Sequence, residues 1–169
     1  LQGPFDAGTG LMRDDLRAAL LLPSTEPYSA LGFTHVNGGG GEQVSAGVFA
    51  ITGANAIVDW VMVEARSTTP PYAVLATRSA LLQRDGDIVG TDGSSPVLLQ
   101  VAPGSYRLSV RHRNHFGAMT ANAVPLGAAP VTVDFRAVET ATYGTDARKN
   151  DLGTWMLWAG NARKDGIMK

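Results

Sequence analysis

The chain has 169 residues, 14 of them basic and 15 acidic, which gives a formal net charge of -1 at pH 7. This length suits one domain with a sizeable core, and the balanced charge gives no general attraction to nucleic acid or to an anionic membrane surface. Because cysteine is absent, disulfides, thiolate zinc sites and a cysteine nucleophile are excluded. No apolar run reaches the roughly 18 residues that a membrane-spanning helix needs, so we expect no membrane insertion.

Two features of the sequence concern the surroundings of the chain. Charged residues make up 17% of it, below the roughly 25% of an average soluble domain, which indicates that neighbouring protein covers part of the surface. The opening "LQGPFDAGTG" lacks the basic start and the apolar centre of a secretory signal peptide. Because the chain also does not begin with Met, we expect a processed product or a piece of a longer protein.

Residues 1–45 are predicted to be irregular, with one short helix and a long glycine-rich loop. In "LMRDDLRAALLL", Leu11, Leu16 and Leu20 share a helical stripe, and Thr9 is the expected N-cap. The four consecutive glycines 38–41 predict a loop, because glycine has a large ordering cost. A phosphate cradle would need a preceding strand and a following helix, whereas "EQVSAGVFAITG" predicts a strand.

Residues 46–140 read as the core of an antiparallel β-sandwich. The stretch "AIVDWVMVEAR" alternates with apolar residues on both faces, which is typical of a central strand with Trp60 in the core. The dipeptide Asp85-Gly86, with strand-like sequence on both sides, predicts a hairpin. Further strands are expected in "SPVLLQV", "YRLSVRHRNHFGAMT" and "PVTVDFRAV". This spacing of strands and turns is typical of a sandwich, and residues 141–169 add a last strand in "TWMLWAG".

The stretch "RHRNHFG", residues 111–117, is the densest cluster of polar side chains. Extended as one strand, it places His112 and Asn114 at the end of the core face, with Arg111, Arg113 and His115 on the outer face. His112 and His115 then diverge, so neither a zinc site nor a catalytic pair is expected. We interpret the cluster as structural, with Arg111, Arg113 and His115 as candidates for contact with a partner or ligand.

Carboxylates and tryptophans supply the remaining candidates. Asp85, Asp87 and Asp92 lie in two adjacent turns, where Asp-Gly is ordinary turn chemistry; the alternative is a calcium site shared by the loops. Trp155 and Trp158 are predicted to point to opposite faces. Trp158 is therefore the candidate for an exposed ring that stacks on a sugar. No cofactor other than calcium is indicated.

The segments "LQGPFDAGTGLMRDDLR", "NAIVDWVMVEAR", "PGSYRLSVRHRNHFGAMT" and "WAGNARKDG" occur in an order that resembles a domain near the C-terminal end of large secreted, multidomain surface proteins. Those proteins come from bacteria that use type nine secretion. The resemblance covers nearly the whole chain and implies an extracellular, cell-surface location rather than a chemistry. It also implies a following dockerin-like calcium loop, whose start here would be Asn161 and Asp165. Arg163 stands between them, and arginine cannot ligate a cation.

The strand-turn-strand pattern around "VAPGSYRLSV" also looks like prealbumin-like and collagen-adhesin-repeat sandwiches, an analogy at the level of the fold. We therefore expect a single β-sandwich domain over residues 1–169 that is not an enzyme. Its expected function is structural: a spacer, docking or polymerising module that forms a homo-oligomer or polymer, with a sheet edge as the pairing surface. The alternatives are a carbohydrate-binding module, with glycans as partners, and a hydrolase of unknown class.

Overall fold

The structure is a computed structural model and describes residues 1–160. Its centre is the antiparallel pair of ten-residue strands β3 (Ile57–Arg66) and β4 (Val74–Gln83). All but the last residue of β3 are buried, as expected of a central strand with apolar residues on both faces. The predictions of an antiparallel, all-β fold and of a central strand here are confirmed.

Four further strands complete a sheet of six. Its order is β5-β4-β3-β6-β7, and β8 pairs with the other end of β6. The added strands are β5 (Ile88–Val89), β6 (Gly104–His112), β7 (His115–Met119) and β8 (Val124–Leu126). The turn at Asp85-Gly86 connects β4 to β5, with Leu82 opposite Ile88, which confirms the predicted hairpin.

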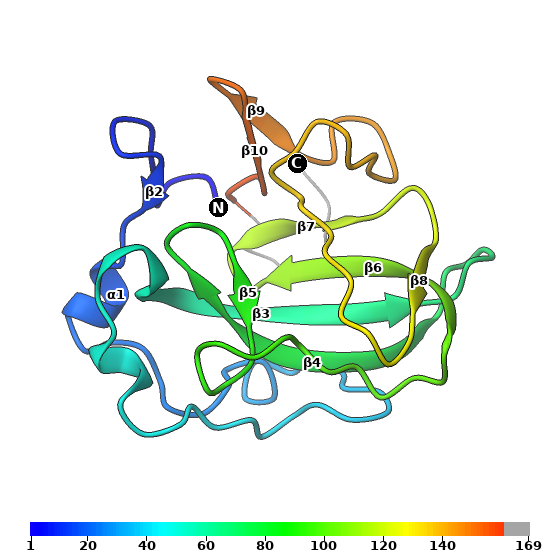
Figure 1. Ribbon diagram of the computed structural model, residues 1–169, viewed down its shortest axis with the longest axis horizontal. Helices are drawn as coiled ribbons and strands as arrows, with labels where there is room; N and C mark the ends of the chain where they lie inside the picture. The colour runs from blue at the N-terminus through cyan, green and yellow to red at the C-terminus, as the bar shows by residue number, and fades with distance from the viewer. Residues whose placement is uncertain (161–169) are drawn as a thin grey trace.

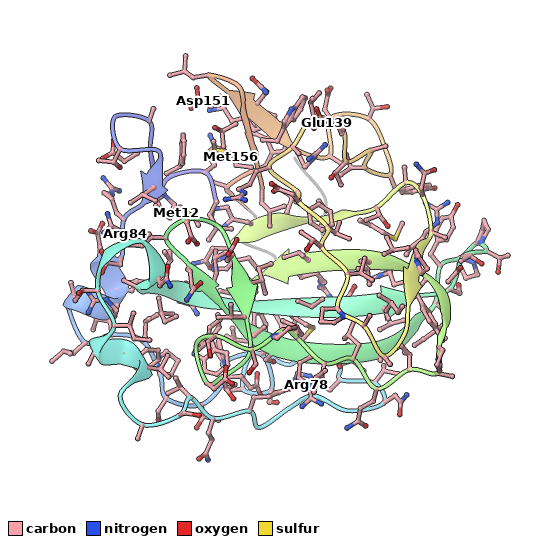
Figure 2. All side chains as sticks on the ribbon, viewed as in Figure 1. Met12, Arg78, Arg84, Glu139, Asp151 and Met156 are labelled. Carbon is pink, nitrogen blue, oxygen red and sulfur yellow. The ribbon has the colours of Figure 1, made fainter. Side chains whose placement is uncertain are left out.

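Two small hairpins lie on one side of this sheet. One joins β1 (Phe5–Asp6) to β2 (Leu11–Met12), and the other joins β9 (Lys149–Asp151) to β10 (Thr154–Met156). Figure 1 shows both above the sheet, near opposite ends of the chain. Their methionines, Met12 and Met156, are buried and lie on this same side (Figure 2). The predicted C-terminal strand is thus present as the short strand β10.

Each face of the sheet carries its own apolar core. The first core lies under the two hairpins and contains Met12, Val58, Val61, Val63, Ala80, Leu82, Val110, Ala118 and Leu157. The second core lies on the opposite face and contains Leu22, Tyr28, Val48, Ile57, Trp60, Met62, Leu81 and Val89. The segment over residues 16–51 covers the second core and is largely irregular. Within residues 1–160 no second large sheet faces the first, so irregular chain and small hairpins stand where a sandwich would have its second layer.

The helix expected at the N-terminus is shorter and begins later than predicted. α1 (Asp15–Ala18) follows Asp14, whereas Thr9 donates to Asp6 within the β1–β2 turn. Leu11 belongs to β2, and Leu20 has left the helix with a φ of 58°. Residues 11 and 12 form a hairpin strand and not the first turn of a helix because Met12 N donates to Arg84 O (2.7 Å), which fixes β2 against the sheet.

Three of the predicted strands are absent. The stretch after the glycine loop forms the 3-10 turns η1 (Val48–Ala50) and η2 (Gly53–Asn55), and neither 95–101 nor 130–138 pairs with a strand. In 95–101, Val97 and Leu99 pack on the first core while Leu98 is exposed. The alternation of apolar and polar residues in 95–101 therefore arises because one side of an extended segment is buried, and it does not indicate pairing with another strand.

The glycine loop covers the outer edge of β4. Gly39 comes so close to this strand that a Cβ atom would lie 2.7 Å from Thr77 O, and its φ of 82° also favours glycine. The buried Glu26 carboxylate accepts hydrogen bonds from Tyr28 N (2.6 Å) and Gly41 N (2.9 Å). Although burial alone would raise the pKa of Glu26, these hydrogen bonds lower it below its usual value. The predicted loop is thus present, and its contacts hold it against β4.

Both outer edges of the sheet are covered by chain outside the strands. Along β4, Thr77 N donates to Val36 O (2.8 Å) and Ser79 N to the Glu42 carboxylate (3.2 Å). Along β7, Phe116 N donates to Trp158 O (2.9 Å). The open sheet edge expected as a pairing surface is thus covered at these positions. In the part of the chain described, no helix is long and apolar enough to cross a membrane.

Candidate functional site

The stretch "RHRNHFG" is a tight β-hairpin and not one continuous strand. β6 ends at His112, β7 begins at His115, and the two histidines face each other across the two-residue turn Arg113-Asn114. Their Nδ1 atoms lie 2.9 Å apart, so the prediction that the two side chains diverge is wrong. Two-residue hairpins normally need positive φ at the turn, and neither turn residue has it. For that reason Arg113 and Asn114 carry none of the usual sequence signals of a hairpin.

The two histidines belong to a buried polar chain. His112 Nε2 lies 3.1 Å from the Asp59 carboxylate, and His115 Nε2 lies 2.7 Å from Gln2 O. The main-chain oxygen of Gln2 can only accept, so the Nε2 of His115 carries a hydrogen. His115 is 6% exposed, and it lies inside the fold rather than on the expected outer face. Burial lowers the pKa of His115 to about 4, so it is uncharged at neutral pH.

The arginines of this hairpin also have partners within the protein. Arg113 Nη1 lies 2.7 Å from the Asp59 carboxylate, which it shares with His112. Arg111 points to the second face of the sheet, where its Nη1 lies 3.2 Å from Glu64 and its guanidinium lies over the ring of Phe33. The hairpin therefore fixes β3, β6 and the N-terminal segment together, and of its two arginines Arg111 is the more exposed, at 33%.

Of the three candidate calcium ligands of the turns, the carboxylates of Asp85 and Asp92 bond to the turns themselves, while Asp87 contributes its main-chain N–H. Asp85 accepts a hydrogen bond from Asp87 N (3.1 Å), and Asp92 accepts bonds from the Ser95 side chain and from the main-chain N–H of Ser94 and Ser95. These hydrogen bonds lower the pKa of Asp92 to about 2. Among residues 1–160 no three acidic or histidine side chains converge on a metal position. Asn161 and Asp165 lie outside the described residues.

The two C-terminal tryptophans differ in their surroundings. Trp158 Nε1 donates to Asp146 O (2.9 Å), and its carbonyl accepts from β7, so Trp158 helps to close the sheet edge. Trp155 lies under the Arg148 guanidinium, 5.0 Å from its carbon, and lines a cleft that the sequence did not indicate. The sequence spacing of the two tryptophans does not indicate that Trp158 lies at the sheet edge and Trp155 at a cleft.

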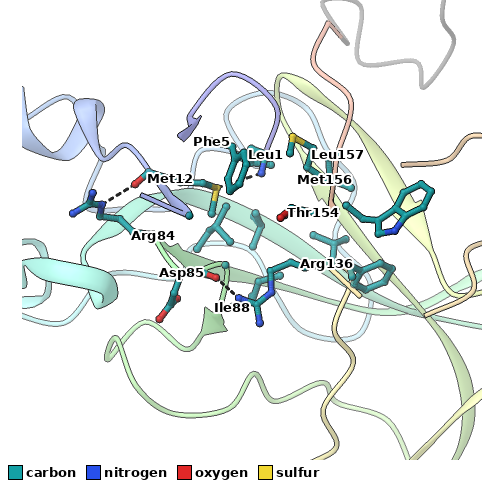
Figure 3. A pocket seen from close by; sticks show the side chains of 17 residues that line it. Leu1, Phe5, Met12, Arg84, Asp85, Ile88, Arg136, Thr154, Met156 and Leu157 are labelled. Carbon is teal, nitrogen blue, oxygen red and sulfur yellow. Dashed lines mark hydrogen bonds between the residues drawn. The ribbon is translucent and has the colours of Figure 1, made fainter. Parts of the chain in front are cut away.

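That cleft, here called the apolar cleft, lies between the sheet and the two hairpins. It has a volume of about 310 Å³. Phe5 and Met12 form one wall, Trp155 and Met156 another, and Val61 and Leu82 contribute to the floor. Figure 3 shows these side chains converging from both ends of the chain. No local sequence pattern indicates the apolar cleft, because its walls come from residues more than a hundred positions apart.

The charged side chains at the rim of the apolar cleft are already bonded to the protein. Arg84 Nε donates to Met12 O (2.7 Å) and so ties the first hairpin to the sheet. Arg136 pairs with Asp134 (2.9 Å) and donates to Asp85 O. Both hydrogen bonds to main-chain oxygens are drawn in Figure 3. The cleft is therefore suited to hold apolar groups.

Comparisons of the chain with models of protein families, with curated proteins and with solved structures each found no match.

Proposed function

We propose that this chain is a non-catalytic interaction module of a secreted or cell-surface assembly, and that copies of it associate through the apolar cleft. The apolar cleft is the observation that carries the proposal. It is open, its walls are apolar, and about 310 Å³ is enough for a large aliphatic side chain but small for an extended substrate. The extracellular location belongs to this proposal through the sequence resemblance alone.

A matching apolar projection supports a second copy as the occupant. Leu152 lies at the tip of the β9–β10 hairpin and is 86% exposed. Its φ of 49° places it in the left-handed region, which costs a non-glycine residue about 1–2 kcal/mol. Asn or Gly would relax this turn, so a leucine there is suited to contact rather than to local stability. A projection on one copy that enters a cleft on the next makes a head-to-tail contact, which continues into a chain or ring.

The state of the polar clusters supports a non-catalytic role. Asp59, His112 and His115 are 3%, 3% and 6% exposed, and none of them lines the apolar cleft. A hydrolase would need such groups to converge on a site that substrate can reach. Their hydrogen bonds instead join the N-terminal segment to the sheet.

The test is the mass in solution of the protein and of Leu152→Asn, measured by light scattering over a range of concentrations. We expect the mass of the unchanged protein to rise with concentration and that of Leu152→Asn to stay monomeric. Because Asn tolerates the left-handed conformation, the melting temperature of the variant should not fall. Leu20→Asn is the matched control, since Leu20 is also exposed (90%) with a φ of 58°. A wild-type monomer at every concentration, or equal effects of both variants, would contradict the proposal.

A further inference from the structure

A second cleft lies on the face of the sheet opposite the apolar cleft, beyond the part that residues 16–51 cover. It has a volume of about 540 Å³, and we call it the arginine–tyrosine cleft. The register of the sheet sets its floor: Met62, in the second core, faces Arg111, and Glu64 faces Ser109. The side chains that shape it are Arg66, Tyr72, Ser109, Arg111, Met119 and Tyr143.

Positive charge exceeds negative charge at this cleft. Glu64 is 1% exposed and accepts from Arg66 Nε (2.7 Å) and Arg111 Nη1 (3.2 Å). A third guanidinium, that of Arg107, lies next to the cleft, with its carbon 4.5 Å from the centre of the Tyr72 ring. In the part of the chain described, Arg107 has no carboxylate partner within ion-pair distance. One buried carboxylate thus balances three arginines.

Hydrogen-bond donors at the cleft also exceed the acceptors that the protein supplies. A guanidinium has five N–H groups. Arg111 places one of them on Glu64, and within residues 1–160 it makes no other hydrogen bond. Arg107 donates from Nη1 to Thr120 O (2.9 Å), while its buried Nε has no partner among the described residues. Arg111 is 33% exposed, so its remaining donors are within reach of a ligand.

Aromatic rings stand beside these donors. Tyr72 and Tyr143 meet edge to face, with ring centres 5.0 Å apart, and Tyr143 is 50% exposed. Tyr72 has a φ of 57°, an unfavourable conformation for a bulky residue and one that is enriched at functional sites. Gly117 keeps the floor low beside Arg111, because a Cβ atom there would lie 2.9 Å from Val110 O and 3.2 Å from Arg111 Cγ.

We propose that the arginine–tyrosine cleft binds an acidic saccharide, a sugar ring that carries a carboxylate. The carboxylate would accept two hydrogen bonds from Arg111, the arrangement that planar guanidinium groups favour, and the surplus charge of Arg107 would attract it. The exposed face of Tyr143 would contact the apolar face of the ring, while Ser109 offers a hydroxyl to a sugar oxygen. A small inorganic anion would leave the aromatic side of the cleft unused. This site is separate from the apolar cleft and does not depend on its role.

Calorimetric titration with a tetramer of galacturonic acid tests the proposal. We expect binding that weakens when NaCl is raised from about 0.05 M to about 0.5 M, since salt screens the partly exposed charges. A neutral galactose tetramer and sodium acetate at the same carboxylate concentration are the comparison ligands, and both should bind at least about tenfold more weakly. Equal affinity for the neutral tetramer would overturn the role of the arginines. Equal binding of acetate would overturn the role of the sugar ring.

Arg111→Gln should weaken binding of the acidic tetramer at least about tenfold, because it removes a charge-assisted hydrogen-bond donor. Arg13→Gln is the matched control: it removes the same charge from an exposed side chain (59%) in the N-terminal segment and should leave the affinity unchanged. If Arg111→Gln does not fold, Tyr143→Ala decides, since its half-exposed ring can be removed without a change in charge. Unchanged affinity in the folded variant, or an equal loss in Arg13→Gln, would refute the site.

Discussion

The two clefts of this protein are built in different ways. The apolar cleft is formed where segments from both ends of the chain dock on the sheet, whereas the arginine–tyrosine cleft is formed mostly by neighbouring positions on β3, β6 and β7. The first depends on how segments distant in the sequence pack on the sheet, and the second on strand register, which is fixed once the sheet forms. The apolar cleft should therefore be more sensitive to changes in the covering segments, and the arginine–tyrosine cleft to changes in the sheet.

The largest expected effect is a loss of stability that differs between two adjacent leucines of β4, which pack on opposite faces of the sheet. Leu81 packs in the second core and is 0% exposed, while Leu82 is 5% exposed and borders the apolar cleft. Leu81→Ala should lower the free energy of unfolding by about 3–4 kcal/mol, and Leu82→Ala by about 2–3 kcal/mol, because less new cavity is created beside an existing one. Urea unfolding of both variants measures the difference. A larger loss for Leu82→Ala would show that the apolar cleft is closed in solution.

Acid should loosen the attachment of the N-terminal segment that walls the apolar cleft. The pKa of His115 is lowered by burial from its usual 6.5 to about 4, so between these values the unfolded chain binds more protons than the folded one. The stability contributed by this residue is complete above about pH 6.5 and decreases as the pH falls to about 4, in total by about 2–3 kcal/mol.

Thermal unfolding between pH 7 and pH 4 checks this effect, with His115→Gln as the comparison because glutamine keeps a donor for Gln2 O. The variant should be less stable at neutral pH but should lose less stability on acidification. The explanation fails if the two melting-temperature curves run parallel over the whole range.

A smaller effect should be confined to the other face. Glu64→Gln removes the one negative charge between Arg66 and Arg111, which are 25% and 33% exposed. Because water reaches both arginines, the loss of unfolding free energy should be about 1–2 kcal/mol rather than the larger cost of an isolated buried charge. Repulsion between the arginines should make the loss greater at low salt than at high salt. Chemical denaturation at two salt concentrations measures this, and a salt-independent loss would argue against an electrostatic cause.

The sequence predicted those parts of the molecule that depend on local pattern. The alternation in "AIVDWVMVEAR" correctly indicated a central strand, and Asp85-Gly86 a hairpin. The prediction failed where contacts between distant segments decide the outcome. Leu11 joins a hairpin because Arg84 holds Met12, and residues 95–101 stay unpaired although they alternate.

The candidate sites were likewise predictable only where a local sequence pattern determines them. Arg111 was a candidate from the sequence because strand period two places its side chain on the face of β6 opposite to that of the apolar Val110. Tyr72 and Tyr143, which complete its cleft, come from a loop and from irregular chain, and no local pattern connects them. His115 was misplaced because the chain reverses at Arg113-Asn114, in a turn without glycine, which puts His115 opposite His112 on the same face. The exchange is local, because the pairing then shifts in register and Ala118 lies opposite Val110 on the face that strand period two predicts.

The side chain and main chain of Gln2 bring the first and last described segments together. Gln2 N donates to Leu157 O (3.0 Å), and Ala159 N donates to the Gln2 side chain (2.9 Å). Residues 1 and 160 can therefore be joined by a short linker and the chain reopened at the exposed loop of residues 127–130, which lines neither cleft. Such a circularly permuted protein would keep both clefts while the order of its strands along the chain changed. The fold is thus specified by which surfaces meet and not by the point at which the chain starts.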